Sequence, residues 1–404
     1  MAAGRERYAD HERVVTIDQS RANIERWRHL NAFISVTDEV GPGPAVAVKD
    51  LIDVAGTITT AGAVVLPPVV AQTDAPLIRR IREAGCVVVG KTNLHEFAYG
   101  TTGLNPHFGP VLNPHDTNRI AGGSSSGSAV AAATGMCDWA IGSDTGGSVR
   151  IPASLCGVVG FKPTLGTVST VGVVPLSRTL DTIGTFATTV ETAARGVEMM
   201  SGLELLSERP PAYGDLKLAV PANWIEDLGD STARAWHRVS SRLPRIDLPD
   251  ISRFVQLSFP IVRTEAAAYH RHFMEQAADR YSPDILNLLR RGFDVLAVDY
   301  VDALRRRLEI AEEMECAMTG LDALVLPTTA ITAPRIDEAE ASNLLELLTR
   351  LTRPFNITGQ PAICIPVPTE GPPVGIQVVG RTGQDARLIG IARACEVHWR
   401  TQSA

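Results

Sequence analysis

The sequence lacks the features that would direct a protein to nucleic acid or to a membrane. Its net charge is −7, and its 38 Lys and Arg residues form no basic block of the kind that a nucleic-acid footprint needs. No run of about 18 apolar residues occurs, so no membrane span is expected. The first 14 residues are polar and charged, without the apolar core of a secretion signal. We therefore expect a cytoplasmic protein that binds neither nucleic acid nor membrane.

Metal-binding patterns are missing as well. His95 and Glu96 begin like a zinc motif, but no second histidine follows at the required spacing, and His270 and His272 do not share a helix face. No two cysteines have CxxC spacing, and their apolar surroundings are typical of buried thiols in a reducing compartment. The six cysteines are Cys86, Cys137, Cys156, Cys316, Cys364 and Cys395. We predict no metal and no cofactor.

The hydrophobic pattern predicts an α/β protein. Ala45–Val48 is expected to be a buried strand, residues 73–85 a helix, and Cys86–Val89 a second buried strand. Strand, helix and strand in this order indicate a parallel crossover unit. The expected fold is a mixed β-sheet core with helices on both faces.

The remaining elements follow the same periodicities. Further strands are expected at Trp139–Gly142, Val158–Phe161, Leu324–Leu326 and Val374–Val379, and helices at residues 124–135, 185–202 and 262–318. A softer, proline-rich zone at about 203–260 interrupts the pattern, and strand signals resume after it. We interpret this zone as an insertion on one continuous core, so that residues 1–404 form a single domain.

Two glycine-rich matches do not fit the structures that they would require. Residues 85–92 match the phosphate-binding pattern GxxxxGK[ST], but three consecutive valines between the glycines favour a buried strand. Residues 123–127 match the nucleophile elbow GxSxG with Ser125 at its centre. The segment before them is a polar loop and not the hydrophobic strand that an elbow follows. We adopt neither interpretation.

A third signal has a clearer chemical meaning. Residues 122–128 read GGSSSGS, and residues 142–150 read GSDTGGSVR, which places Ser148 directly after two glycines. Two glycines allow successive backbone N–H groups to converge on one point, as they do in an oxyanion hole. A plain glycine-rich turn would have the same composition, so this segment alone leaves its function open.

Taken together, these segments resemble the amidase signature family. The matches occur in the same order along most of the chain, which makes a chance resemblance improbable. They comprise Leu30–Ile34, Ala45–Gly56, Val87–Gly100, Asn113–Ser128, Ala140–Pro163, Leu324–Thr329, Asn356–Pro366 and Pro373–Gly380. Ser126 departs from the pattern, because the family usually has glycine there; serine keeps the loop small, and we expect little effect.

The resemblance implies a role for three side chains. Ser148 matches the nucleophile, Ser124 matches the bridging serine that follows a cis peptide bond in the family, and Lys49 matches the base. The oxyanion hole would consist of the backbone N–H groups of Thr145, Gly146, Gly147 and Ser148. Asp144 and Arg150 flank the nucleophile and are expected to hold the loop that carries it.

These roles agree with the chemistry of the residues themselves. A serine hydroxyl needs a base to become a nucleophile. A free lysine has a pKa of about 10.4, so a base that works near pH 7 needs a shift of roughly 3 units, which burial behind the 45–48 strand can supply. The Ser124 hydroxyl accepts and donates a proton and can connect Lys49 to Ser148. A cysteine amidase built on Cys156 with Lys162 is less favoured, because Cys156 has no activating neighbour.

We predict an amide hydrolase that releases ammonia or an amine from a small amide through an acyl-enzyme on Ser148. The glutamine-hydrolysing component of a tRNA-dependent amidotransferase is the alternative within the family. An inactive binding module of the same fold is the third hypothesis, and the presence of Lys49, Ser124 and Ser148 argues against it. The sequence does not identify the amide, and it leaves open whether the protein forms a homodimer.

Overall fold

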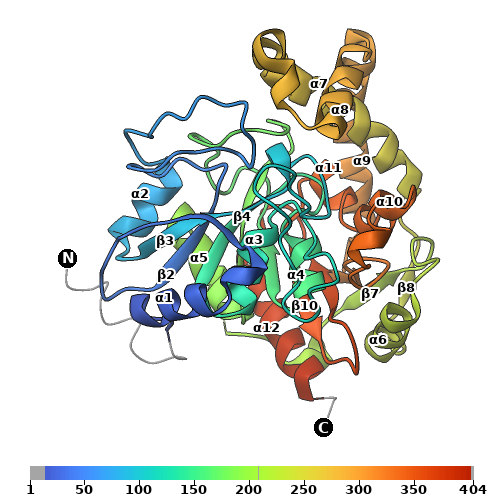
Figure 1. Cartoon of the computed structure of the whole chain (residues 1–404). Coiled ribbons are helices and arrows are strands. Elements are labelled where there is room, and N and C mark those ends of the chain that lie inside the picture. The colour runs from blue at the N-terminus through green and yellow to red at the C-terminus, as the bar shows by residue number, and fades with distance from the viewer. Residues whose placement is uncertain (1–13, 208, 402–404) are drawn as a thin grey trace.

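The computed structural model describes residues 14–207 and 209–401 (Figure 1). The N-terminal residues 1–13, which contain most of the segment used to judge a secretion signal, lie outside the described residues. The described residues form one sheet of eleven strands in the order β1-β3-β2-β4-β6-β5-β10-β11-β9-β7-β8. The strands are β1 (Phe33–Val36), β2 (Ala45–Lys49), β3 (Val87–Thr92), β4 (Trp139–Asp144), β5 (Val159–Lys162), β6 (Thr182–Ala187), β7 (Leu218–Pro221), β8 (Arg245–Ile246), β9 (Ala323–Pro327), β10 (Ala362–Val367) and β11 (Val374–Val379).

The sheet is mixed. β3, β2 and β4 run parallel to one another at one end, and β9, β7 and β8 do so at the other. The strands between β4 and β9 pair antiparallel. The predicted parallel pairing of the two strands on either side of the 73–85 helix is thus confirmed, as is the α/β class with a mixed sheet.

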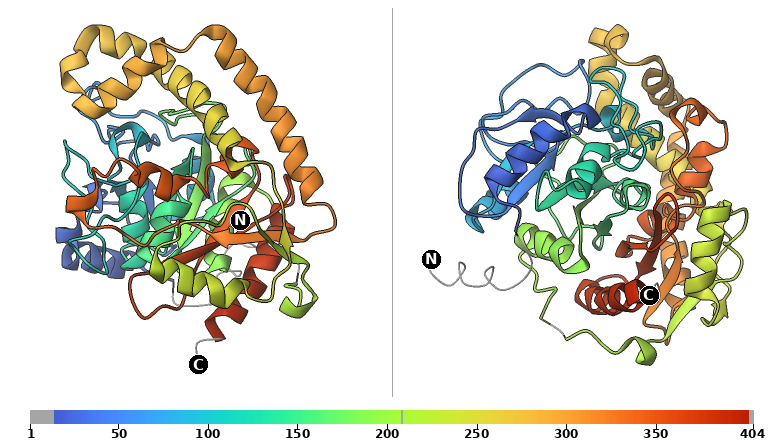
Figure 2. Two further views of the ribbon diagram at one scale, coloured as in Figure 1. Left: turned by 90° about the vertical axis from the view of Figure 1, so that its right-hand side faces the viewer. Right: turned by 60° about the horizontal axis from the view of Figure 1, so that its bottom comes forward.

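Helices cover both faces of this sheet. They are α1 (Ile17–Arg26), α2 (Pro76–Glu83), α3 (Ser126–Ala133), α4 (Arg150–Cys156), α5 (Val190–Ser201), α6 (Asp230–Ser240), α7 (Ile251–Ala277), α8 (Pro283–Phe293), α9 (Ala297–Ala317), α10 (Leu344–Thr349), α11 (Pro354–Ile357) and α12 (Asp385–Thr401). Both views of Figure 2 show α7 in yellow and α9 in orange standing together beside the sheet. α11 packs against α7, which brings these helices close to the core of the molecule.

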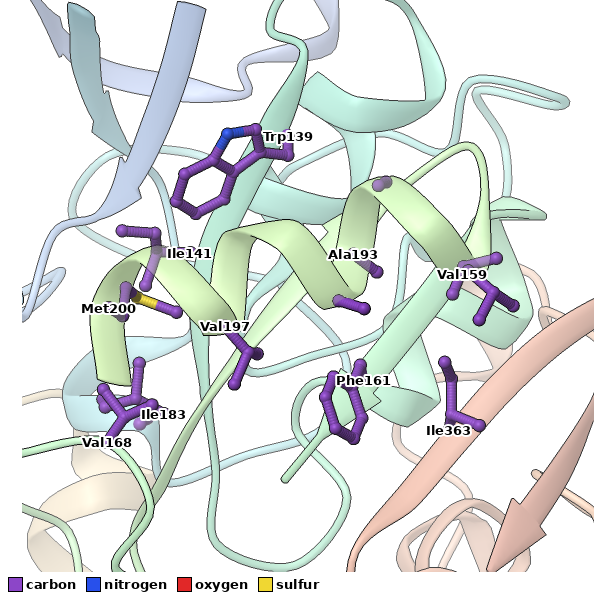
Figure 3. Packing of buried hydrophobic residues seen from close by; sticks show 14 of the residues in the cluster. Trp139, Ile141, Val159, Phe161, Val168, Ile183, Ala193, Val197, Met200 and Ile363 are labelled. Carbon is purple, nitrogen blue, oxygen red and sulfur yellow. The ribbon is translucent and has the colours of Figure 1, made fainter. Parts of the chain in front are cut away.

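The alternation of side chains along β2 shows how the two faces are filled. Val46 and Val48 join the large apolar cluster that α2, α5 and α12 cover, and Figure 3 shows α5 lying across this cluster. Ala45 and Ala47 point to the opposite face, where α3 and α4 pack. Alanine on that face leaves room for a helix to approach the sheet closely.

Several predicted elements differ from the observed ones at their ends. Residues 185–202 are not one helix, because residues 185–187 complete the buried strand β6 and α5 begins only at Val190. The 86–89 strand extends to Thr92. The first helix begins at Pro76 with Ala75 as its N-cap, because the Asp74 carboxylate instead accepts the Ala55 N–H at 2.8 Å.

The zone at about 203–260 contains β7, α6, β8 and the beginning of α7. Its strand β7 pairs in parallel with β9, so the zone adds to the same sheet. α7 starts at Ile251 and continues through Pro260, earlier than the predicted start at residue 262. Proline content misled the sequence interpretation here, because packing on α9 and α11 retains a helix that proline alone would interrupt.

Within residues 14–207 and 209–401, no helix has both the length and the apolar character needed to cross a bilayer. Five of the six cysteines are buried, as expected, but Cys316 on α9 is exposed and corrects that expectation.

Gly127 in the first turn of α3 allows a close approach of backbones, and it provides a test of this packing. A Cβ atom at this site would lie 2.2 Å from the Ala32 carbonyl oxygen and 2.7 Å from the backbone of Asn93. We predict that Gly127→Ala lowers the free energy of unfolding by about 1–3 kcal/mol, because overpacking forces the backbone to move. Gly214→Ala is the control, since a Cβ atom there meets nothing within 4 Å. Equal thermal stability of the two variants would contradict the prediction.

Candidate active site

Lys49 is the last residue of β2, which lies between two parallel neighbours, β3 and β4. Its side chain is fully buried. The Lys49 Nζ atom lies 2.7 Å from Ser124 Oγ and 2.9 Å from Ser143 Oγ. The structure therefore brings Lys49 and Ser124 together as the sequence predicted, and it adds Ser143, which the sequence interpretation did not single out.

Burial lowers the pKa of Lys49 to about 7, although the negative charges of Asp181 and Asp144 oppose this shift. A substantial fraction of the amine is therefore neutral near pH 7, and a neutral amine has a lone pair to accept a proton. When Ser143 accepts one N–H of the amine, the lone pair remains available to the Ser124 hydroxyl. This arrangement suits a general base.

Ser124 follows a cis peptide bond from Gly123, as the resemblance implied. It is fully buried, and its carbonyl oxygen accepts the backbone N–H of His95 at 3.1 Å. The next residue, Ser125, donates its N–H to the carbonyl oxygen of Ser148 at 3.3 Å. The two serine segments are therefore in contact through their backbones.

Ser125 has a structural role in this arrangement. Its hydroxyl is buried and donates to the carbonyl oxygen of Ser143 at 3.1 Å. An elbow nucleophile needs an exposed hydroxyl at the end of a strand. The geometry agrees with our rejection of the GxSxG interpretation.

Ser148 lies in the turn between β4, which ends at Asp144, and α4, which begins at Arg150. Its exposed fraction is 6%, in contrast to 0% for Ser124. The Thr352 hydroxyl, ahead of α11, donates to the carbonyl oxygen of Gly146 at 2.7 Å. A Cβ atom on Gly147 would lie 2.2 Å from the Thr352 Oγ1 atom, which explains why glycine is needed there.

The backbone N–H groups of this turn are not all available for an oxyanion hole. The Gly147 N–H donates to Asp144 Oδ1 at 2.9 Å, inside the loop. This interaction narrows the predicted set of donors to the N–H groups of Thr145, Gly146 and Ser148. The sequence could not reveal the difference, because it depends on the direction in which each peptide plane faces.

Asp144 and Arg150 form a buried ion pair with an Nη2–Oδ1 distance of 2.9 Å and a second contact, Nε–Oδ2, at 3.1 Å. Burial acts to raise the pKa of Asp144, but Arg150 outweighs it and holds that pKa well below its usual range. Arg150 also donates to Thr352, Gln377 and Asn356. The pair thus joins the turn that carries Ser148 to the segment before α11, to α11 itself and to β11.

A second set of hydrogen bonds connects the same turn to α7. Thr145 donates to Asp181 at 2.6 Å, and Asp181 also accepts the Ser177 N–H at 3.1 Å. Ser177 in turn donates its hydroxyl to Glu265 on α7 at 2.6 Å. Burial raises the pKa of Asp181 to about 6. No motif pointed to these residues; an acidic residue in a buried segment was the only available signal.

The other candidates from the sequence form no reactive site. Burial, together with the charge of Lys49, lowers the pKa of His95 to about 4, and Glu96 pairs with His107 at 3.0 Å. Burial raises the pKa of the Cys156 thiol, whereas the Lys162 amine donates to the Pro163 carbonyl oxygen at 3.0 Å. In the part of the chain that the structure describes, no group of three or more His, Cys, Asp or Glu residues could hold a metal ion.

The chain is similar to known amidases over nearly its whole length. A family model described as Amidase matches residues 42–389. The first component (GatA-type) of the glutamyl-tRNA(Gln) amidotransferase of Thermotoga maritima is 34% identical, with 91% of this chain and 88% of that protein covered. The AtzE component of 1-carboxybiuret hydrolase from Pseudomonas sp. (strain ADP) is 33% identical over 94% of this chain and 90% of that protein. A crystal structure of an amidase has a TM-score of 0.87 at 33% identity, with 95% of each chain covered.

The chain therefore belongs to the amidase family, and its mixed sheet with helices on both faces is the fold of that family. It is an enzyme of the carbon–nitrogen hydrolase class.

The Asp144–Arg150 pair leads to a prediction about the stability of the site. Arg150→Lys keeps the charge but loses the fork that bonds Asp144 twice and reaches two further side chains. We expect a loss of about 3–5 kcal/mol in the free energy of unfolding, measured by denaturant titration. Arg195→Lys, at a partly exposed i,i+4 pair with Glu191, is the control and should change stability by less than about 1 kcal/mol.

The pKa of Lys49 leads to a prediction about reactivity. Protonated Lys49 cannot accept a proton, so the rate at which a fluorophosphonate labels Ser148 should fall about tenfold per pH unit below about pH 7. Lys49→Arg should slow labelling by at least about 10²-fold, as Lys49→Ala does, because Arg stays protonated. Lys217→Arg, at an exposed lysine, is the matched control. Rapid labelling of Lys49→Arg would mean that another group is the base.

Proposed function

We propose that the protein hydrolyses a small amide through an acyl-enzyme on Ser148, with Ser124 as the proton bridge and Lys49 as the base. The observation that carries this proposal is the buried 2.7 Å contact between Lys49 Nζ and Ser124 Oγ, combined with the lowered pKa of Lys49. A buried lysine in contact with a serine hydroxyl is costly for stability unless its neutral form is used.

Two other buried lysines help to assign the base. Lys91 forms an ion pair with Asp50 at 2.8 Å, and Lys162 donates to a backbone carbonyl. Among the described residues, neither of these amines forms a hydrogen bond with Ser124 or Ser148. The amine of Lys49 is thus the one that meets the serine segments, which supports its role as base.

The reaction follows from these contacts. Lys49 takes the proton of Ser124 as Ser124 takes that of Ser148, and Ser148 Oγ attacks the carbonyl carbon of the amide. The oxygen of the tetrahedral intermediate is stabilised by backbone N–H groups of Thr145, Gly146 and Ser148. The relay then returns the proton to the leaving nitrogen, the C–N bond breaks, and water releases the acid by the same route.

A second candidate function is supported by the relatives. Several relatives that are 31–34% identical are GatA-type components of glutamyl-tRNA(Gln) amidotransferases. On this hypothesis the amide is glutamine, the ammonia passes to a second reaction, and the protein requires partner chains. Ammonia release from glutamine by the purified chain, measured with and without the other amidotransferase components, distinguishes the two candidates.

The test of the proposed nucleophile is Ser148→Ala. We expect the rate of amide hydrolysis to fall by at least about 10³-fold with little change in the melting temperature, because the hydroxyl contributes to chemistry more than to packing. Peptide mapping after fluorophosphonate treatment of the wild-type protein should place the adduct on Ser148. Ser125→Ala is the control, since its hydroxyl bonds only backbone groups. An adduct on Ser125 would contradict the assignment.

A further inference from the structure

Arg353 is a buried cation without a buried anion to balance it. Its exposed fraction is 8%, and its Nη2 atom donates to the Thr349 hydroxyl at 2.8 Å. Among residues 14–207 and 209–401, no carboxylate lies within ion-pair distance of it. Burial lowers the pKa of Arg353 to about 10, with only Glu346 acting in the opposite direction. Arg150, the other arginine buried to this degree, is paired with Asp144. A buried arginine without a counter-ion is unfavourable unless something else supplies the charge.

This unpaired cation is adjacent to the turn that carries Ser148. Thr352, the preceding residue, contacts both glycines of that turn: its hydroxyl donates to Gly146, and its Oγ1 atom occupies the space where a Cβ atom of Gly147 would lie. The Thr352 carbonyl oxygen accepts from Arg150 at 3.0 Å. The segment that ends in Arg353 is therefore held against the nucleophile turn, and its position is fixed from both sides.

Arg263 on α7 approaches the same place from the helical side. The guanidinium carbons of Arg353 and Arg263 lie 5.0 Å and 4.7 Å from the centre of the Phe259 ring. Burial raises the pKa of Tyr99, and the charge of Arg263 opposes that shift, so Arg263 also lies near Tyr99. Figure 1 shows α11, next to Arg353, between the α7–α9 helices and the catalytic core.

Arg263 is also without an ion pair among the described residues. Asp294 and Asp299 line a cavity of about 360 Å³ together with Arg263, between α7 and α9. Neither carboxylate comes within ion-pair distance of the Arg263 guanidinium. Two cations that share one aromatic ring, with no carboxylate bound to either, produce a concentrated positive potential at this side of the site.

We propose that Arg353 and Arg263 form a carboxylate-binding subsite, so that the substrate is an amide whose acyl chain carries a carboxylate. This inference rests on the proposed function, since it names the substrate class of the Ser148 site. A guanidinium presents two parallel N–H groups that match the two oxygens of a carboxylate. The Phe259 ring keeps both guanidinium groups in place, and a bound anion would supply the missing charge of Arg353. A neutral amide would leave Arg353 unpaired, and an amide with an ammonium group would be repelled.

The experiment compares anionic and neutral amides on the full chain. The probes are the monoamides of propanedioate, butanedioate and pentanedioate, with butanamide as the neutral reference. We expect kcat/KM for the best anionic amide to exceed that for butanamide by at least about tenfold in the wild-type protein. Arg353→Met and Arg263→Met should each reduce this ratio by at least about tenfold, mainly through KM. Arg263→Glu should shift the preference toward 4-aminobutanamide.

The matched control is Arg271→Met, which removes a positive charge from the same helix at a side chain that is 73% exposed. Its ratio should stay within about twofold of the wild-type value. Protection of Ser148 from fluorophosphonate labelling by succinate gives a readout that does not need turnover, and it should be lost in Arg353→Met. If Arg353→Met does not fold, Arg263→Met and Arg353→Lys provide the same comparison.

The outcomes separate the two proposals. Equal ratios in the wild-type protein and in both arginine variants, or succinate protection that persists in them, would overturn the subsite while Ser148-dependent ammonia release upholds the hydrolase. Absence of both an anionic preference and succinate protection in the wild-type protein would also overturn the subsite. Ammonia release that does not depend on Ser148 would overturn the proposed function, whatever the arginine variants do.

Discussion

The buried ion pair between Asp144 and Arg150 is the constraint on which the nucleophile turn depends. One carboxylate accepts the N–H groups of Gly147 and Val149 inside the turn, and Arg150 extends the same network to Asn356 and Gln377. Such a pair stabilises a fold only when all its hydrogen-bonding groups are used, as they are here. Strands and helices that are far apart in the sequence therefore meet at the turn that carries Ser148.

The electrostatic balance at Lys49 results from the same arrangement. Complete burial disfavours the charged amine, whereas Asp181 and Asp144 favour it, and the outcome is a pKa of about 7. Because Asp144 is already paired with Arg150, its negative charge is partly compensated and does not force Lys49 to stay protonated. A network that holds the turn in place thus also sets the protonation of the proposed base, which lies at the end of a neighbouring strand.

Much of the fold could be predicted, because several elements have one dominant periodicity. The buried strands at 45–48 and 374–379 and the helices within 262–318 were found from apolar patterns that packing reinforces. The strand β6 was missed because its threonines and glycine have no strong pattern, and its buried place between β4 and β5 is decided by tertiary pairing. The softer zone hid a strand and the start of α7 for the same reason: neighbours determine those structures more strongly than local propensity does.

The sequence by itself determined the family, the nature of the three proposed catalytic side chains and the strand that ends in Lys49, since these depend on short contiguous motifs. Only the tertiary structure decided that Ser143 contacts Lys49, that the Gly147 N–H is engaged by Asp144, and that Thr352 is pressed against the nucleophile turn. It also left Arg353 buried without a counter-ion beside that turn. These features depend on distances between residues up to 206 positions apart, on the direction of single peptide groups and on burial. A linear pattern of residue types contains none of these quantities.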